Sequence, residues 1–218
     1  MRTRLDEGLE RLNHEMIEMG ALCEEVIALA ASALTGGDTA LAAQVLPRGK
    51  RIDQKERDIE TLCMKLLLLQ QPVARDLRQI SAALKMITDR ERIGDQAEDI
   101  AEIVSFLDGR TSGEQTHLKE MAASVIRMVT DSVEAYVKKD PALAQTVIDY
   151  DDVVDDAFVR VKEQLIALIA ADPGQGEYAL DLLMIAKYLE RIGDHATNLA
   201  EWVIYAVTGV HKSEEEDE

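Results

Sequence analysis

The pentapeptide Glu-Arg-Ile-Gly-Asp occurs twice in this chain, at 91–95 and again at 190–194. The likeness continues at the same offset of 99 residues, for example from Ala97 to Ala196. Self-similarity at a fixed offset is typical of a duplicated structural unit. We therefore predict that the chain consists of two copies of one fold.

Each copy is predicted to contain three helices. Hydrophobic residues make up 47% of the chain and aromatic residues only 4%, and a composition dominated by Leu, Ile, Val, Ala and Met favours helices over a sheet. Glycine and proline fall between the apolar stretches rather than within them. We expect helices over about 3–35, 38–70, 74–108, 114–138, 141–171 and 177–208. Asp140 and Pro141 have the order of an N-cap and a first-turn proline.

Short connections require neighbouring helices to pack antiparallel. The predicted fold class is therefore all-α, with two tandem, pseudo-symmetric three-helix bundles made of six long antiparallel helices. We place the first unit at 1–110 and the second at 111–208, followed by an acidic tail at 209–218.

The chain is strongly acidic, with a formal net charge of −18 at pH 7. Five acidic residues lie within 213–218, and we expect this end of the chain to be disordered and solubilising. Such a surface repels nucleic acid and anionic lipid, so it predicts cations or a basic protein as partners.

No apolar stretch approaches the length of a membrane span, and the charged N-terminal segment is unlike a signal peptide. These features predict a cytoplasmic protein whose association with a membrane would come only through its partners. Cys23 and Cys63 have no metal-binding or redox spacing, and we expect both to be reduced core residues.

Acidic residues gather on one face of the third and sixth predicted helices. Successive helical residues turn by about 100°, which places these carboxylates in a stripe beside the buried face. The stripe contains Glu91, Asp95, Glu98, Asp99 and Glu102 in the first copy, and Glu190, Asp194, Asn198 and Glu201 in the second. Like charges four residues apart destabilise a helix by about 0.2–0.5 kcal/mol per pair. Bound multivalent cations would remove this repulsion, although an acidic solvent-exposed face remains the alternative.

The second helix of each copy adds further carboxylates. Asp53, Glu56 and Glu60 cluster in the first copy, and Asp151 and Asp155 lie one turn apart in the second. Two facing rows of carboxylates would offer oxygen ligands only. Such ligands favour hard or borderline ions such as Mg, Ca, Mn or Fe, with Zn also allowed.

Two glycines and two arginines of the repeated motif can each be explained in two ways. Gly94 and Gly193 lie inside helices, where each costs about 1 kcal/mol relative to Ala, so either tight helix packing or close approach of a ligand must explain them. Arg92 and Arg191 flank the acids and could orient them or balance their charge.

The segment Gln71-Pro72-Val73-Ala74-Arg75-Asp76-Leu77-Arg78, followed by the two Glu-Arg-Ile-Gly-Asp copies, resembles the PhoU family of phosphate-signalling proteins. The resemblance covers about 1–208 and implies multinuclear iron or zinc clusters on paired acidic motifs. It also implies a negative regulator of phosphate uptake, rather than an enzyme, that links a phosphate ABC transporter and its ATPase to a sensor histidine kinase. The sequence leaves the oligomeric state open, with a homodimer as one option.

The resemblance implies ligand roles for the residues that match the family motif: Glu91, Asp95 and Asp99 in the first copy, and Glu190, Asp194 and Asn198 in the second. Together with the acids of the second helices, they form the expected set of metal ligands: Glu91, Asp95, Asp99, Glu190, Asp194, Asn198, Asp151, Asp155, Asp53 and Glu56.

The two copies differ at several of these positions. Gly49 occupies the position that matches Asp151, so the first copy lacks one expected acid on its second helix. Phe158 and Lys162 stand where the first copy has Glu56 and Glu60, and the Asp-Leu-Arg segment has no counterpart in the second copy. Equal metal loading of the two sites is therefore not expected.

Two other classes of protein fit parts of the pattern. A ferritin-like di-iron enzyme needs two Glu-x-x-His motifs, but only Glu114 and His117 form one here. A metal-free helical adaptor would have the same fold, and its acidic residues would form a solvent-exposed surface.

Overall fold

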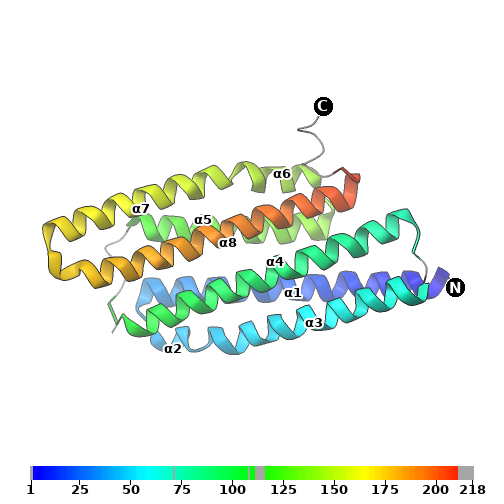
Figure 1. The fold of residues 1–218 in the computed structure, drawn as a ribbon, viewed down its shortest axis with the longest axis horizontal. Helices are drawn as coiled ribbons and strands as arrows, with labels where there is room; N and C mark the ends of the chain where they lie inside the picture. The colour runs from blue at the N-terminus through cyan, green and yellow to red at the C-terminus, as the bar shows by residue number, and fades with distance from the viewer. Residues whose placement is uncertain (1, 71, 108, 111–115, 211–218) are drawn as a thin grey trace.

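The structure is a computed structural model that describes residues 2–70, 72–107, 109–110 and 116–210. Within these ranges all regular structure is helical and no strand occurs (Figure 1). The helices are α1 (Arg2–Gly36), α2 (Thr39–Ala42), α3 (Val45–Gln70), α4 (Ala74–Phe106), α5 (Thr116–Lys138), α6 (Pro141–Asp149), α7 (Asp151–Ala171) and α8 (Gly176–Thr208), with a short 3₁₀ turn η2 (Pro173–Gln175) before α8. The predicted all-α fold is confirmed.

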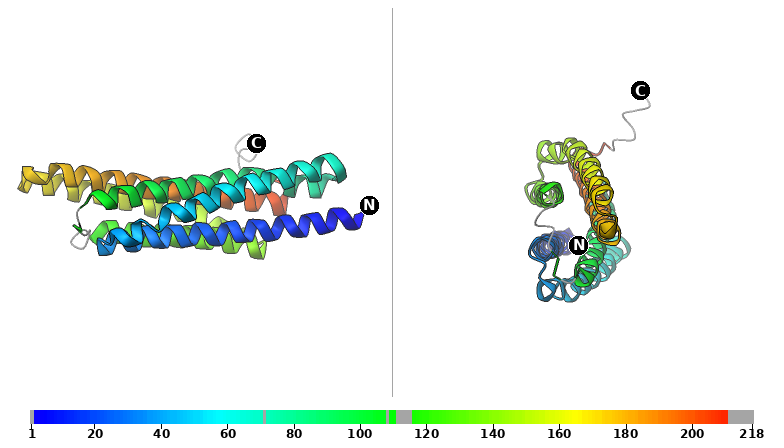
Figure 2. Two further views of the ribbon diagram at one scale, coloured as in Figure 1. Left: turned by 90° about the horizontal axis from the view of Figure 1, so that it is seen from below. Right: turned by 90° about the vertical axis from the view of Figure 1, so that its left-hand side faces the viewer.

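The helices form two similar halves that lie side by side along a common long axis. Helices α1–α4 make one half and α5–α8 the other, as Figures 1 and 2 show. The halves meet where α4 runs antiparallel to α8 and where α1 packs against α5. Four long helices therefore form the centre of the molecule, and α3 and α6–α7 lie outside it. The domain boundaries predicted at 110 and 208 stay a prediction.

Each half has its second helix in two pieces, which corrects the continuous helices predicted over 38–70 and 141–171. In the first half, Ala43 and Gln44 form a turn between α2 and α3. The proline ring of Pro47 would clash with the carbonyl of Ala43 in a continuous helix, so α3 begins just before Pro47. In the second half the single residue Tyr150 separates α6 from α7, with no proline at that point.

Two aspartates cap the short helices in the same way. Asp38 Oδ1 accepts hydrogen bonds from the backbone N–H groups of Ala40 and Leu41, at 2.9 and 3.0 Å. Asp140 Oδ1 accepts the equivalent bonds in the second half, as its position before Pro141 predicted. Each cap satisfies donors that a helix start leaves free, which explains why these elements begin where they do.

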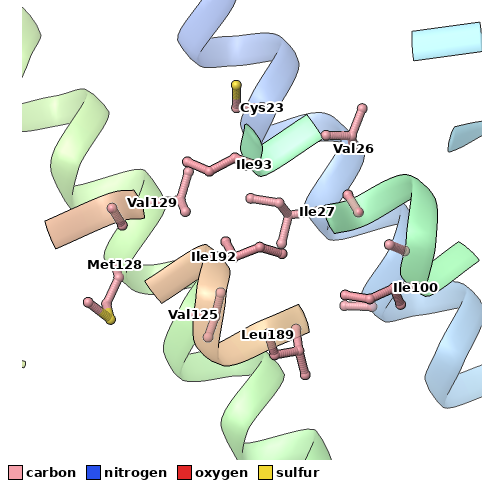
Figure 3. Close-up of a cluster of buried hydrophobic side chains, with 14 of the residues drawn as sticks. Cys23, Val26, Ile27, Ile93, Ile100, Val125, Met128, Val129, Leu189 and Ile192 are labelled. Carbon is pink, nitrogen blue, oxygen red and sulfur yellow. The ribbon is translucent and has the colours of Figure 1, made fainter. Parts of the chain in front are cut away.

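One hydrophobic core extends through both halves. Figure 3 shows Ile27 of α1, Ile93 of α4, Val129 of α5 and Ile192 of α8 meeting at the centre, and all four side chains are buried. The buried face of α4 consists of Ile93, Ala97, Ile100, Ala101 and Val104. The two bundles are thus fused through a shared core rather than joined at a polar interface.

The ends of the predicted helices agree with the structure where it describes them. Helix α4 ends at Phe106 and α5 begins at Thr116, and residues 108 and 114–115 lie outside the described ranges. The predicted acidic tail lies almost entirely outside them as well, at 211–218. Among the helices that the structure describes, none is long and apolar enough to cross a bilayer.

Candidate metal centre

Three carboxylates of the first half converge between α3 and α4. Asp53 on α3 and Glu91 and Asp95 on α4 each offer one oxygen, and these oxygens all lie within 4.8 Å of one another. The three side chains are half-buried. Gly94 permits this approach, because a Cβ at Gly94 would lie only 3.1 Å from Ile52 of α3. Tight packing of α3 on α4 therefore explains this glycine and also brings the acidic rows together.

The carboxylates of this group disfavour one another's charge. Burial and the Asp95 carboxylate raise the pKa of Glu91, while Arg92 lowers it. Burial, Glu60 and Asp53 raise the pKa of Glu56. The group therefore holds more negative charge than its surroundings neutralise, as expected of a site that a cation would stabilise.

Arg92 is the cation nearest to this group. Its guanidinium contacts Glu91 Oε2 at 3.5 Å and Asp95 Oδ2 at 3.3 Å, and the side chain is about half exposed, at 52%. Exposed ion pairs of this kind contribute little to stability, typically about 0–1 kcal/mol. Arg92 thus balances part of the charge of the group while leaving the oxygens open to solvent.

The second half has a smaller and less acidic counterpart. Burial and the nearby Asp194 and Asp155 carboxylates raise the pKa of Asp151 on α7. Burial and the Glu190 carboxylate raise the pKa of Asp194 on α8, where Lys187 lowers it. In the described part of the chain, three ligand oxygens within 4.8 Å of one another occur in the first half and not here.

An aromatic residue replaces one acid of the first group in this second cluster, and a lysine lies beside it. Lys187 forms an ion pair with Glu190 and its Nζ lies 5.6 Å from the centre of the Phe158 ring. Phe158 holds the position that matches Glu56. The exchange of a carboxylate for an aromatic ring, with a lysine where the first copy has Thr88, supports the expectation that the two sites are unequal.

The third position of each motif lies toward the junction of the halves. Asn198 Nδ2 donates a hydrogen bond to Asp89 Oδ1 of α4 at 3.1 Å, and His195 Nδ1 lies 2.9 Å from the same oxygen. Burial and the Asp95 and Glu102 carboxylates raise the pKa of Asp99, while Arg191 of α8 lowers it. Asn198 thus binds a residue across the α4–α8 junction.

Comparison with known proteins assigns the chain to a family. The profile described as the PhoU domain matches residues 16–104 and again 118–203. The chain belongs to the PhoU family. It is 36% identical over 210 residues to a phosphate-specific transport system accessory protein PhoU homolog of Clostridium acetobutylicum, with 94% of each chain covered.

Solved PhoU structures have the same fold. The crystal structure of PhoU from Pseudomonas aeruginosa matches with a TM-score of 0.90 at 34% identity, covering 94% of this chain and 99% of that one. The phosphate transport system regulatory protein PhoU from Streptococcus pneumoniae matches with a TM-score of 0.85 at 26% identity, covering 95% and 98%. The resemblance to PhoU inferred from the paired motifs is confirmed.

One carboxylate of this PhoU-family chain was not included in the expected ligand set. A Cβ at Gly49 would lie 1.7 Å from Glu98 Oε1, so the Glu98 carboxylate fills the space beside Gly49. Burial, Asp53 and Asp95 together raise the pKa of Glu98 to about 7. The first half therefore does not lack the acid that Gly49 seemed to remove, because α4 supplies it. The sequence indicates this exchange through two differences between the copies: the first copy has Gly49 where the second has Asp151, and Glu98 where the second has Thr197.

The histidines of the described chain lie apart from the three converging carboxylates. His14 contacts Glu18 at 3.2 Å, His117 contacts Glu120 at 3.3 Å, and His195 contacts Asp89. Glu114 and His211 lie outside the described residues. The described site thus offers oxygen donors alone, which does not favour the ferritin-like alternative.

Proposed function

We propose that this chain is a metal-binding regulatory protein of phosphate transport, acting as a negative regulator of phosphate uptake and of phosphate-starvation signalling. Its relatives in Clostridium acetobutylicum and Streptococcus pneumoniae are named as accessory and regulatory proteins of phosphate transport systems. Membership of the same family over nearly the whole chain supports a role of that kind for this protein. We infer that it acts by binding partners rather than by catalysis, in the cytoplasm.

The observation that carries the metal-binding part is the convergence of Asp53, Glu91 and Asp95, whose oxygens approach within 4.8 Å of one another. Carboxylate donors without nitrogen or sulfur suit hard and borderline cations. We propose multinuclear iron or zinc as the bound metal, and this donor set fits iron better because zinc more often takes histidine or cysteine. Glu56 and Glu98 would complete the first site. Asp151, Asp155, Glu190 and Asp194 would hold a second, weaker one.

Metal would act on partner recognition through charge. An unloaded acidic groove repels acidic surfaces and attracts basic ones, and a loaded groove does so less. We propose that the acidic faces dock on the ATPase of a phosphate ABC transporter and on a phosphate-sensing histidine kinase, and that metal loading sets their affinity. Any association with the membrane would come through these partners.

The metal is tested by elemental analysis of protein purified without chelator or metal-affinity resin. We expect several equivalents of iron or zinc per chain, with a large loss in Asp95→Ala and a smaller loss in Asp194→Ala. Glu163→Ala is the matched control, because Glu163 is an exposed acid of α7. Equal metal content in all four proteins would overturn the assignment of these ligands.

The metal-free adaptor alternative makes the opposite prediction for stability. Without metal, Asp95→Ala should raise the free energy of unfolding by about 0.5–1 kcal/mol, because repulsion by Glu91 and Asp99 is relieved. With metal bound, the same change should lower it. Urea unfolding before and after chelation separates the two cases. A stabilising effect in both states, together with no bound metal, would favour the adaptor.

Docking is tested with the purified ATPase and the cytoplasmic part of the kinase from the same organism. We expect saturable binding under phosphate-replete conditions and a change in affinity after chelation, measured by biolayer interferometry. If neither partner binds, the docking proposal is abandoned, whereas the metal assignment is decided by its own measurement.

A further inference from the structure

A cavity of about 540 Å³ lies between the two halves, away from the acidic grooves. Side chains of α1, α4, α5 and α8 line it, at the end of the molecule where α4 begins and α8 ends (Figure 1). This volume lies within the range of roughly 300–1,000 Å³ that is typical of small-molecule pockets. Much of the wall is apolar, formed by Leu, Ala and Val side chains such as Leu12, Ala83 and Val203.

The polar part of the wall is cationic, in contrast to the rest of this acidic protein. Arg75, Arg78 and Lys139 line the cavity and Glu10 is the one acid among its lining residues. Within the part of the chain that the structure describes, no ion pair engages these three cations, and Arg78 Nε is buried without a hydrogen-bond partner. Among the described lining residues, three cations and one carboxylate leave a net charge of two positive units.

A fourth cation lies buried behind the wall. Arg90 of α4 is only 1% exposed, and its guanidinium lies 5.3 Å from the centre of the ring of Tyr136, which lines the cavity. Arg90 donates a hydrogen bond to the carbonyl of Met16, but no described carboxylate pairs with it, and its Nε is also unpartnered. An uncompensated buried charge is strongly unfavourable unless an opposite charge lies near it.

The three arginines of this region have no basic counterparts in the second copy of the repeat. The residues that match Arg75, Arg78 and Arg90 in the second half are Gly174, Glu177 and Leu189. The duplicated unit alone therefore does not account for the charge of the cavity.

Lys139 is held in an uncommon backbone conformation. Its φ of 53° lies in the left-handed region, and Gly37, the matching residue of the first half, has a φ of 62°. Glycine is the usual residue at such a helix end, because a side chain is strained there. A lysine at this position places its cation at the cavity at the expense of backbone strain.

We propose that this cavity binds a small organic dianion, a phosphate monoester whose phosphate contacts Arg75, Arg78 and Lys139 and whose less polar body lies against the apolar wall. Arginine matches phosphate oxygens in bidentate geometry, and the net charge of two positive units matches a dianion. The apolar wall favours a ligand with an aromatic or aliphatic body over inorganic phosphate. The site is separate from the carboxylate groups, and the proposal does not depend on metal.

The test is calorimetric titration of the full, chelator-treated chain with AMP, and with inorganic phosphate for comparison. We expect saturable binding of AMP, weaker binding of phosphate, and a loss of AMP affinity of about tenfold or more in Lys139→Gly and in Arg75→Gln, as for a lost charged hydrogen bond. Lys119→Ala, which removes an exposed cation of α5 away from the cavity, should bind AMP as the unchanged protein does.

Lys139→Gly also distinguishes a loss of AMP binding from a loss of folding. Glycine relieves the positive φ, so this variant should unfold at the same or a higher temperature while binding AMP less tightly. Absence of AMP binding to the unchanged protein would overturn the proposal. So would equal affinity for AMP and phosphate, or equal AMP affinity in Lys139→Gly and Lys119→Ala.

Discussion

Glu98 and Gly49 together occupy the space that Asp151 and Thr197 occupy in the other half of the molecule. A side chain at Gly49 would overlap the Glu98 carboxylate, with 1.7 Å between its Cβ and Oε1. In the second half Asp151 carries the carboxylate on the second helix, and the neighbouring Thr197 side chain lowers its pKa. The carboxylate at this place in the groove thus comes from α4 in the first half, as Glu98, and from α7 in the second half, as Asp151.

This exchange predicts strong coupling between residues 49 and 98. Gly49→Asp should lower the free energy of unfolding by about 1–3 kcal/mol, because the new side chain crowds Glu98 and adds a like charge. Adding Glu98→Thr should restore most of this loss, because the pair then matches Asp151 and Thr197. Urea unfolding of the two single variants and the double variant measures the coupling energy. Additive effects within about 0.5 kcal/mol would show that the two positions are independent.

Arg90 is predicted to reduce the stability of the unliganded protein. Burial lowers the pKa of its guanidinium, and the Glu24 carboxylate offsets only part of this effect. Replacing it with methionine should raise the free energy of unfolding by roughly 1–3 kcal/mol, because a buried charge is exchanged for an apolar side chain. Arg57→Met, at an exposed position of α3, should change it by no more than about 0.5 kcal/mol. A loss of stability in Arg90→Met would mean that its hydrogen bond to Met16 and its contact with Tyr136 outweigh the desolvation of the charge.

Asp89 is predicted to hold the two halves together at the α4–α8 junction. Its Oδ1 contacts His195 Nδ1 at 2.9 Å and accepts a hydrogen bond from Asn198 at 3.1 Å. Asp89→Ala leaves both partners without their acceptor and should lower the free energy of unfolding by about 1–2 kcal/mol. Chemical denaturation checks this, with Glu163→Ala as the exposed-acid control. Equal effects of the two substitutions would argue that the junction does not depend on these contacts.

The two cysteines are predicted to be unreactive in the folded protein. Both side chains are fully buried and unpaired, and burial raises the pKa of the Cys23 thiol and that of the Cys63 thiol to about 12. The thiolate is the reactive form, so at pH 8 a disulfide reagent should modify neither residue in the native state. Two thiols per chain should react in urea. Rapid modification of the native protein would indicate frequent local opening near α1 or α3.

The secondary structure and the duplication of this chain could be predicted from the sequence because both depend on local spacing. Asp38 and Asp140 reveal helix starts through their own backbone neighbours, and the buried face of α4 follows from the spacing of Ile93, Ala97 and Ile100. The division of the second helix was readable as well, because Pro47 excludes a continuous helix, although the expected range ignored it. The acidic stripes were found for the same reason, since residues four apart share a face on any helix.

The tertiary structure alone decided which of these acids meet. The convergence of Asp53 with Glu91 and Asp95 depends on the crossing of α3 over α4, which is determined by the packing of Gly94 on Ile52. Asn198 shares its helical stripe with Asp194, yet it contacts Asp89 because α8 lies against α4 there. The buried Arg90 and the cationic cavity likewise arise where helices far apart in sequence come together. Helical periodicity gives the direction of a side chain about its own axis, but the residue it meets depends on the distance and register between helices.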